Sequence, residues 1–129
     1  MIVADTDILI DALEGRPAVA AVVEDLLRSR RIATTAISRI ELGVGAVTPE
    51  ERRRVESLIA AIPVLPVDGE AGRIAGERGA ELRAAGASLP LADLAIASVC
   101  LALDVPLLTR NQKHFRRIEG LRLADAPAG

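Results

Sequence analysis

The sequence predicts an α/β fold, in which a central, mostly parallel, twisted sheet of four to five strands carries helices on both faces. Two observations support this fold class. Short apolar runs alternate along the chain with segments of helical spacing, and such alternation implies right-handed crossovers between parallel strands. The 129 residues also contain no repeat or linker. A single domain over residues 1–129 is therefore expected, burying about two-thirds of the surface that its unfolded chain would expose.

Strands and helices alternate from the first residue onward. The apolar run 1–4 predicts a buried strand, and a short helix is expected to follow it and to end near Gly15. Apolar residues at helical spacing predict a helix over 18–31, whose basic end suits the negative end of the helix dipole. A second strand is expected at 32–35, and a helix over 38–45.

Capping residues and prolines mark the middle of the chain. Thr48 as cap, with a proline at the first helical position, predicts a helix over 49–61. The segment 62–67 predicts a strand near a sheet edge, because its prolines cannot donate ladder hydrogen bonds. Asp68 is then expected to cap a long helix that runs through Ala85.

Three glycines interrupt this long helix. Gly72, Gly76 and Gly79 each weaken it by about 1 kcal/mol relative to alanine. We therefore expect them to permit a close approach to a neighbouring element.

The most apolar helix is expected to begin at Pro90 and to run to about Leu103. It is apolar all round except for Asp93 and Ser98, so it should lie buried in the middle of the fold. The remaining expected elements are a strand at 105–109, a polar loop or short helix at 110–115, and a final strand near 121–123.

The composition excludes several classes of function. Cys100 is the only cysteine, so neither a disulfide nor a cysteine metal cluster is expected. Phe115 is the only aromatic residue, which argues against a platform for stacking bases. The net charge of −2 argues against a broad surface for nucleic acid, although arginine clusters at 28–31, 52–54 and 116–117 permit a local one. With no signal peptide and no apolar run of about 18 residues, a cytoplasmic protein without a membrane span is expected.

Acidic residues follow the opening strand directly. The triplet Asp5-Thr6-Asp7 would lie at the carboxyl end of that strand, the edge of an open α/β sheet at which ligands usually bind. Alternatively, Asp5 or Thr6 caps the following helix, and Asp7 lies favourably in its positive first turn. The choice depends on whether later segments bring more acids to the same edge.

Two later acids are candidates for that edge. Ser38-Arg39-Ile40-Glu41 has the pattern of a capping box, which favours a structural role for Glu41. Asp93 lies near the start of an otherwise apolar helix, and a buried carboxylate without a partner costs several kcal/mol. Asp93 therefore requires a proton, a cation or an arginine.

A convergence of Asp5, Glu41 and Asp93 would predict a metal site. Carboxylates about 4 to 5 Å apart repel by roughly 4 kcal/mol at an effective dielectric constant near 20, so such a cluster stays ionised only around a divalent ion. Oxygen ligands, without a cysteine cluster and with a single histidine, suit Mg²⁺ or Mn²⁺. Such an ion can activate a water and stabilise charge on a phosphodiester, which predicts phosphoester hydrolysis.

Four blocks of the sequence carry a resemblance that covers essentially the whole chain. They are DTDILI at 5–10, SRIELG at 38–43, PLADLAIA at 90–97 and LTRNQKHF at 108–115. In this order and spacing they resemble the PIN domain, and in particular the VapC-type toxins of bacterial toxin–antitoxin pairs. The resemblance implies a PIN-like fold and a Mg²⁺- or Mn²⁺-dependent endoribonuclease. Its catalytic metal ligands would be Asp5, Glu41 and Asp93.

The same blocks imply supporting residues. Thr6 would act through its hydroxyl or backbone amide, and Asp7 and Thr109 lie beside the implied ligands. PIN domains often carry a fourth acid in the last block, whereas this chain has Asn111 and His114 at the candidate positions. Asn111 could ligate through its carbonyl oxygen or orient a metal-bound water, but the missing charge argues against a second tightly held metal. His114 is either a loop residue packed on the core or a substrate contact.

The resemblance also implies partners. It implies an RNA substrate, a homodimer, and a small antitoxin whose tail covers the acidic groove. The antitoxin usually supplies the DNA-binding part in this family, so the absence of a broad basic face is no objection.

Three other interpretations stay open at this point. The triplet at 5–7 also resembles haloacid-dehalogenase-type phosphatases, but those enzymes need a mid-chain lysine, and Lys113 is the only lysine. A degenerate PIN fold that only binds a protein would explain the missing fourth acid, but has no use for three mutually repelling carboxylates. A housekeeping PIN-type RNase fits the same residues, and the neighbouring gene would distinguish it from a toxin.

Overall fold

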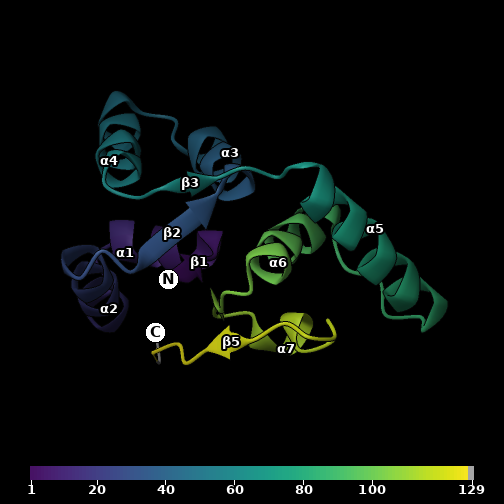
Figure 1. The fold of residues 1–129 in the computed structure, drawn as a ribbon. Coiled ribbons are helices and arrows are strands. Elements are labelled where there is room, and N and C mark those ends of the chain that lie inside the picture. The colour runs from purple at the N-terminus through teal and green to yellow at the C-terminus, as the bar shows by residue number, and fades with distance from the viewer. Residues whose placement is uncertain (128–129) are drawn as a thin grey trace.

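The computed structural model describes residues 1–127 and confirms the predicted α/β fold (Figure 1). Five strands form one parallel sheet in the order β3-β2-β1-β4-β5. The strands are β1 (Ile2–Ala4), β2 (Ile32–Thr35), β3 (Val64–Leu65), β4 (Leu107–Leu108) and β5 (Leu123–Ala124). The helices are α1 (Thr6–Leu13), α2 (Pro17–Arg28), α3 (Ala36–Gly45), α4 (Pro49–Ala60), α5 (Gly69–Ala84), α6 (Leu91–Leu103) and α7 (Gln112–Phe115). No helix in this described part of the chain is long and apolar enough to cross a membrane.

The opening strand β1 occupies the centre of the sheet. Val3 lies opposite Ala33 of β2 on one side and opposite Leu107 of β4 on the other. Because parallel strands end at the same edge of a sheet, the residues that follow β1, β2 and β4 meet there. Asp5, the start of α3 and Thr109 therefore lie together at the carboxyl edge.

Two apolar cores cover the two faces of the sheet. One contains residues of α1, α2 and α4, and the other contains residues of α5, α6 and α7. Side chains alternate between the faces along a strand, so Val3 belongs to the second core and Ala4 to the first. Phe115 is fully buried in the second core. The buried position predicted for α6 is confirmed for its middle, because each residue of the segment 96–100 is at most 2% exposed, whereas Leu91 and Leu103 at its ends are exposed.

Two predicted helix starts are confirmed. Pro49 begins α4 behind the cap Thr48, whose hydroxyl accepts a hydrogen bond from the Glu51 amide at 3.1 Å. Asp68 caps α5, and its carboxylate accepts a hydrogen bond from the Ala71 amide at 2.9 Å. Each start carries a local capping hydrogen bond, which is why the sequence predicts it well.

Several predicted extents are wrong. The helix expected over 18–31 ends at Arg28 instead, and the chain turns at Arg30, which has a left-handed φ of 54°. The strands expected over 62–67 and 105–109 contain two residues each, although β3 does lie at a sheet edge as predicted. The final strand begins later than expected, at Leu123, where it pairs in register with β4.

The capping box predicted for Ser38 and Glu41 is also wrong. The helix α3 begins at Ala36, and its cap is Thr35, whose hydroxyl accepts a hydrogen bond from the Ser38 amide at 3.2 Å. Glu41 therefore does not cap α3.

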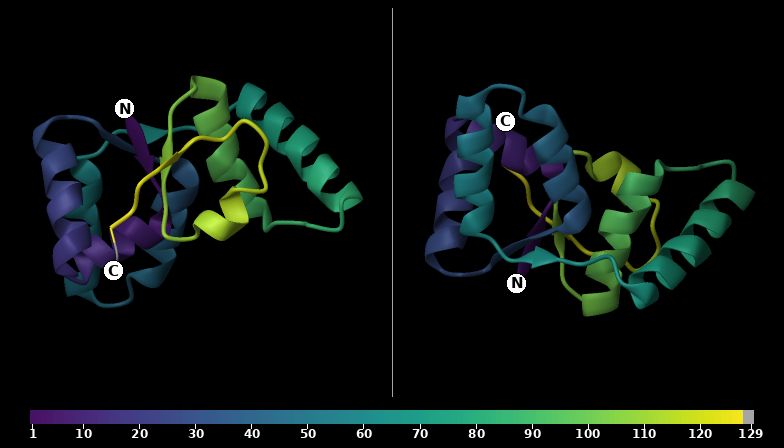
Figure 2. Two further views of the ribbon diagram at one scale, coloured as in Figure 1. Left: turned by 90° about the horizontal axis from the view of Figure 1, so that it is seen from below. Right: turned by 90° about the horizontal axis from the view of Figure 1, so that it is seen from above.

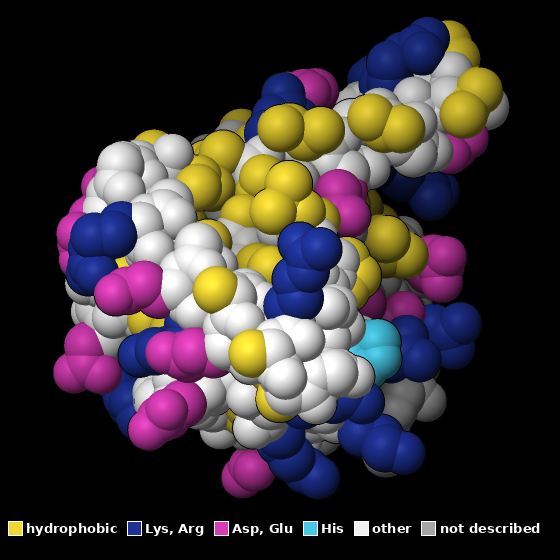
Figure 3. All heavy atoms as spheres, turned by 90° about the vertical axis from the view of Figure 1, so that its right-hand side faces the viewer, with side chains coloured by type: hydrophobic (Ala, Val, Ile, Leu, Met, Phe, Trp, Pro, Cys, Tyr) yellow, Lys and Arg dark blue, Asp and Glu magenta, His cyan; other side chains and the backbone are white. Residues whose placement is uncertain are grey.

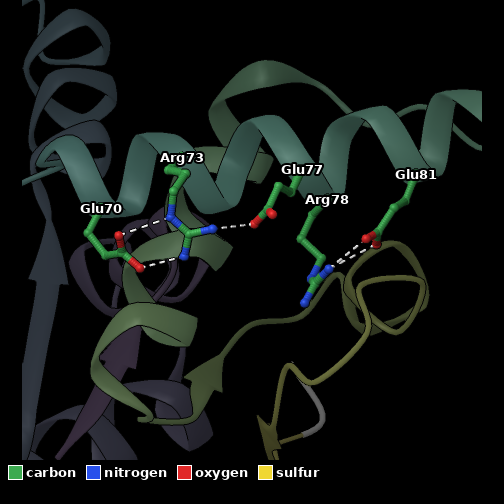
Figure 4. Close-up of polar contacts among 5 residues, drawn as sticks. All are labelled: Glu70, Arg73, Glu77, Arg78 and Glu81. Atoms are coloured by element: carbon green, nitrogen blue, oxygen red, sulfur yellow. Dashed lines mark hydrogen bonds and ion pairs between the residues drawn. The ribbon is translucent and has the colours of Figure 1, made fainter.

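The helices α5 and α6 pack against each other, and α5 extends away from the sheet (Figure 2). A Cβ atom at Gly79 would lie 3.0 Å from Leu94 Cδ1, so the predicted close approach is confirmed there. The prediction is wrong for Gly72 and Gly76, where a Cβ atom would meet nothing within 4 Å. One face of α5 carries a row of ion pairs formed by Glu70, Arg73, Glu77, Arg78 and Glu81 (Figure 4).

The glycines of α5 lead to a stability prediction. Gly76→Ala should raise the free energy of unfolding by about 0.5–1 kcal/mol, because alanine favours the helix and its methyl group meets open space. Gly79→Ala should raise the free energy of unfolding less, because Leu94 must move to accommodate the methyl group. Urea unfolding of the two variants measures the difference. A destabilised Gly76→Ala variant alongside a stabilised Gly79→Ala variant would contradict this packing.

Candidate active site

Asp5 lies at the carboxyl end of β1 and both of its carboxylate oxygens are hydrogen-bonded. Oδ1 accepts a hydrogen bond from the Thr6 amide at 2.8 Å, and Oδ2 accepts one from the Thr109 hydroxyl at 2.7 Å. Asp5 is the N-cap of α1 and is only 7% exposed. The two interpretations of the opening triplet are therefore compatible, because one side chain both caps the helix and lies at the sheet edge.

Asp7 lies in the first turn of α1 and faces the loop after β4. Its Oδ2 accepts a hydrogen bond from the backbone amide of Arg110 at 3.1 Å and lies 3.4 Å from the Thr109 hydroxyl. Its Oδ1 is buried and has no hydrogen-bond partner among the described residues. A buried carboxylate oxygen in this state is costly unless a ligand satisfies it.

Thr6 connects α1 to α3. Its hydroxyl oxygen lies 2.7 Å from Glu41 Oε1 and 2.9 Å from the Ser38 hydroxyl. A hydroxyl has one proton and a carboxylate only accepts, so Thr6 donates to Glu41 and receives a hydrogen bond from Ser38. This contact holds the Glu41 carboxylate at the start of α1.

Asp93 lies half-buried in the first turn of α6. Burial raises its pKa, as do the charges of Glu41 and Asp7, whereas His114 lowers it. These effects require Asp93 to lie within electrostatic reach of all three side chains. The third acid of the prediction therefore faces the same edge as the others.

Burial and mutual repulsion raise the pKa values of acids at this edge. Burial, followed by the charge of Asp7, raises the pKa of Asp5 from its ordinary 3.8 to about 6, although hydrogen bonds from Thr109 and Thr6 lower it. Burial also raises the pKa of Asp7, although the hydrogen bond from the Arg110 amide and the charge of Arg110 lower it. A cation bound among these groups would favour their ionised forms.

The last block contributes Thr109, Asn111 and His114. Thr109 is fully buried, and its hydroxyl accepts a hydrogen bond from the Asn111 amide at 3.0 Å while donating to Asp5. The side-chain nitrogen of Asn111 lies 2.9 Å from His114 Nδ1. This contact engages the amide nitrogen of Asn111 and leaves its carbonyl oxygen outside the pair.

The chemistry of these residues fits a hydrated divalent ion. Within residues 1–127, no three acidic, histidine or cysteine side chains form a closed group that would hold a metal by itself. Mg²⁺ does not require one, because it usually keeps several waters and binds one or two carboxylates directly. The unpartnered Oδ1 of Asp7 and the raised pKa values of Asp5 and Asp93 are the features that such a cation would relieve.

The structure adds one pair of residues that the sequence reasoning missed. Asp11 on α1 has a side chain only 3% exposed; its Oδ2 lies 2.6 Å from Arg110 Nη1, and its Oδ1 lies 3.2 Å from Arg16 Nε. The contact between Asp11 and Arg110 ties the loop after β4 to α1. The backbone amide of Arg110 also donates a hydrogen bond to Asp7. The available signal was the four-residue spacing of Asp7 and Asp11, which places both acids on one side of a largely apolar helix.

Removal of the Thr109 hydroxyl tests how this edge is held together. Thr109→Val should lower the free energy of unfolding by about 1–3 kcal/mol, because Asp5 Oδ2 and the Asn111 amide both lose their partner in a buried setting. Thr109→Ser keeps the hydroxyl, so its free energy of unfolding should fall less. Urea unfolding compares the two. An unchanged Thr109→Val variant would contradict the hydrogen bonding described above.

Comparison with known proteins places the chain in a family. The model of the PIN domain family matches residues 2–121. The chain is 33% identical over 132 residues to ribonuclease VapC10 of Mycobacterium tuberculosis, covering 100% of this chain and 96% of the relative. It is 31% identical over 112 residues to ribonuclease VapC19 of the same species, covering 86% and 89%.

A solved structure agrees with these matches. The fold resembles that of a chain in the crystal structure of VapBC2 from Rickettsia felis bound to a DNA fragment from their promoter. The TM-score is 0.87 at 26% identity, covering 99% of this chain and 100% of the other. The resemblance noted in the four sequence blocks is confirmed: the chain belongs to the PIN domain family, and its relatives there include VapC ribonucleases.

Proposed function

We propose that this protein is a Mg²⁺- or Mn²⁺-dependent endoribonuclease and the toxin of a type II toxin–antitoxin pair. The observation that carries the proposal is the meeting of Asp5, Asp7, Glu41 and Asp93 at one sheet edge, where an oxygen of Asp7 is buried and unpartnered among the described residues. The names of the VapC ribonucleases support RNA as the substrate.

In this proposal each residue has a distinct task. Asp5, Glu41 and Asp93 would hold the ion, which when bound supplies Lewis acidity and a water nucleophile for phosphodiester hydrolysis. Thr6 orients the Glu41 carboxylate, and Thr109 orients that of Asp5.

The remaining residues of the edge support this arrangement. Asp7 adds negative charge and a free oxygen. Asn111 and His114 hold each other at the position where the family often has a fourth acid, so we propose one tightly held ion rather than two.

Exposed apolar side chains and a groove on the surface support the proposal that the protein binds protein partners. Four large apolar side chains on or near α3 and at the start of α6 are more than half exposed, namely Ile40, Val44, Val47 and Leu91. Exposed apolar groups gathered in this way are typical of interfaces, and we assign them to a homodimer. A separate groove of about 240 Å³ between α1, α3 and α4 reaches Glu41, and we assign it to the antitoxin tail.

The alternatives are less favoured. The match to the PIN domain argues against a haloacid-dehalogenase-like phosphatase. The retained acids argue against a purely binding module, and the VapC relatives favour a toxin over a housekeeping RNase.

The proposal is tested by incubating the purified protein with total bacterial RNA in Mg²⁺, in Mn²⁺ and in EDTA. We expect discrete cuts that need the metal and disappear in the Asp5→Ala variant. A well-folded protein, freed of any bound partner, that cuts no RNA with either metal would refute the nuclease assignment. Cuts that persist in EDTA would refute the metal dependence.

A further inference from the structure

The three arginine clusters of the sequence occupy different places relative to the acids. The cluster at 28–31 precedes β2 and thus lies at the amino edge of the sheet, opposite the site. In the cluster at 52–54, Arg54 pairs with Glu50 at 3.3 Å, and Arg52 donates a hydrogen bond to the Val47 carbonyl. The cluster at 116–117 follows α7, and the acidic edge includes Asn111 before this helix and His114 within it. Only this third cluster is joined to the site by a single helical turn.

Three cations share the outward face of this turn. Lys113, Arg116 and Arg117 are exposed and are spaced three and four residues apart, which places them side by side on a helical surface. Behind them, Phe115 and Ile118 are at most 3% exposed and anchor the turn in the core. We call these three exposed residues the α7 basic face.

The charge of the α7 basic face is not balanced locally. Among the described residues, Lys113, Arg116 and Arg117 form no ion pair, in contrast to Arg73 and Arg78 of α5, which are paired with glutamates (Figure 4). The one acid in the same turn is Glu119, which is exposed. Figure 3 shows Lys and Arg side chains beside the histidine, with acidic side chains just above it.

Unpaired like charges at this spacing do not stabilise a helical turn, but they suit an anion. A phosphodiester that approaches the four acids is repelled by them, and cations beside the site offset that repulsion. Building on the proposed nuclease function, we propose that the α7 basic face binds the phosphate backbone of the RNA next to the scissile bond.

The test separates binding from cleavage. A fluorescein-labelled single-stranded RNA of mixed sequence is titrated in EDTA, at salt concentrations from roughly 50 to 200 mM, with wild-type protein and with the triple variant Lys113→Gln, Arg116→Gln, Arg117→Gln. Each lost phosphate contact should reduce the slope of log affinity against log salt by about 0.7, so the triple variant should lose up to about 2. Cleavage in Mg²⁺ should show a raised KM and an unchanged kcat.

A matched control removes the same charge elsewhere. The triple variant Arg30→Gln, Arg31→Gln, Arg53→Gln neutralises three exposed arginines that form no ion pair within residues 1–127, and it should keep the wild-type salt slope. The charge-preserving variant Arg116→Lys, Arg117→Lys should also keep it, which shows that the slope depends on the charge of these positions.

The outcomes distinguish this inference from the proposed function. If the wild-type protein cuts RNA and both triple variants keep its salt slope, the proposed RNA binding by the α7 basic face is overturned. The proposed nuclease function is unaffected by that result. Loss of antitoxin binding without loss of RNA affinity would also overturn the proposed RNA binding, by assigning the face to a protein partner. Wild-type protein that neither binds nor cuts RNA would instead refute the proposed function itself.

Discussion

The Asp93→Asn variant is expected to lose RNA cleavage while keeping its fold. Asp93 is half-buried, and burial and neighbouring acids raise its pKa. Replacing it with asparagine removes a charge that would bind the cation, but creates no cavity. Divalent ions contribute several kcal/mol of transition-state stabilisation to phosphoester hydrolysis, and each 1.36 kcal/mol is tenfold in rate. We therefore expect kcat to fall by about 100-fold or more.

The matched control is Asp25→Asn, which makes the same chemical change at an exposed position of α2. It should cleave like the wild type. Thermal unfolding of both variants in EDTA should show that Asp93→Asn is at least as stable as the wild type, because a repelled carboxylate has been removed. Undiminished cleavage by Asp93→Asn would remove this residue from the site.

In EDTA, the protein is expected to carry an electrostatic penalty that grows as the pH rises. The pKa of Asp5 is about 6 in the folded state against an ordinary 3.8, so between these pH values the folded state binds more protons than the unfolded state. The stability contributed by Asp5 therefore falls as the pH rises through this window. At about 1.4 kcal/mol per pH unit, the total loss is on the order of 3 kcal/mol.

Urea unfolding of the wild type and of Asp5→Asn in EDTA, at pH 4 and pH 7, measures this penalty. The wild type should lose stability relative to the variant between these values, since asparagine does not ionise. Burial raises the pKa of Asp7 and Asp93 too, so in the wild type they act in the same direction. Mn²⁺ at about 100 times its Kd should restore about 2.7 kcal/mol to the wild type at pH 7. A pH-independent difference between the two proteins would contradict the burial of charge at Asp5.

The parts of the site that the sequence predicts are those with a local physical signature. Asp5 follows an apolar strand, and Asp93 interrupts an apolar helix, so each is recognisable from its immediate neighbours. Glu41 shows the limit of such reasoning. Its spacing from Ser38 has the form of a capping box, but Thr35 caps the helix, because β2 runs directly into α3.

Contacts between distant segments could not be predicted in this way. Asp11 and Arg110 are 99 residues apart and meet because β1 and β4 are neighbours in the sheet. Strand order depends on how whole helices pack, and alternating apolar segments alone do not determine it. The glycines of α5 show the same limit, since only the position of α6 reveals that Gly79 needs space and that Gly76 does not.

The most direct test is a titration with Mn²⁺ of the metal-free wild type, Asp93→Asn and Asp25→Asn. Electron paramagnetic resonance measures the unbound ion at each step. We expect the wild type and Asp25→Asn to bind Mn²⁺ with the same affinity, and Asp93→Asn to bind it about 10-fold or more weakly. Equal affinities in all three proteins, or no binding by the wild type, would contradict a divalent-ion site at the carboxyl edge of this sheet.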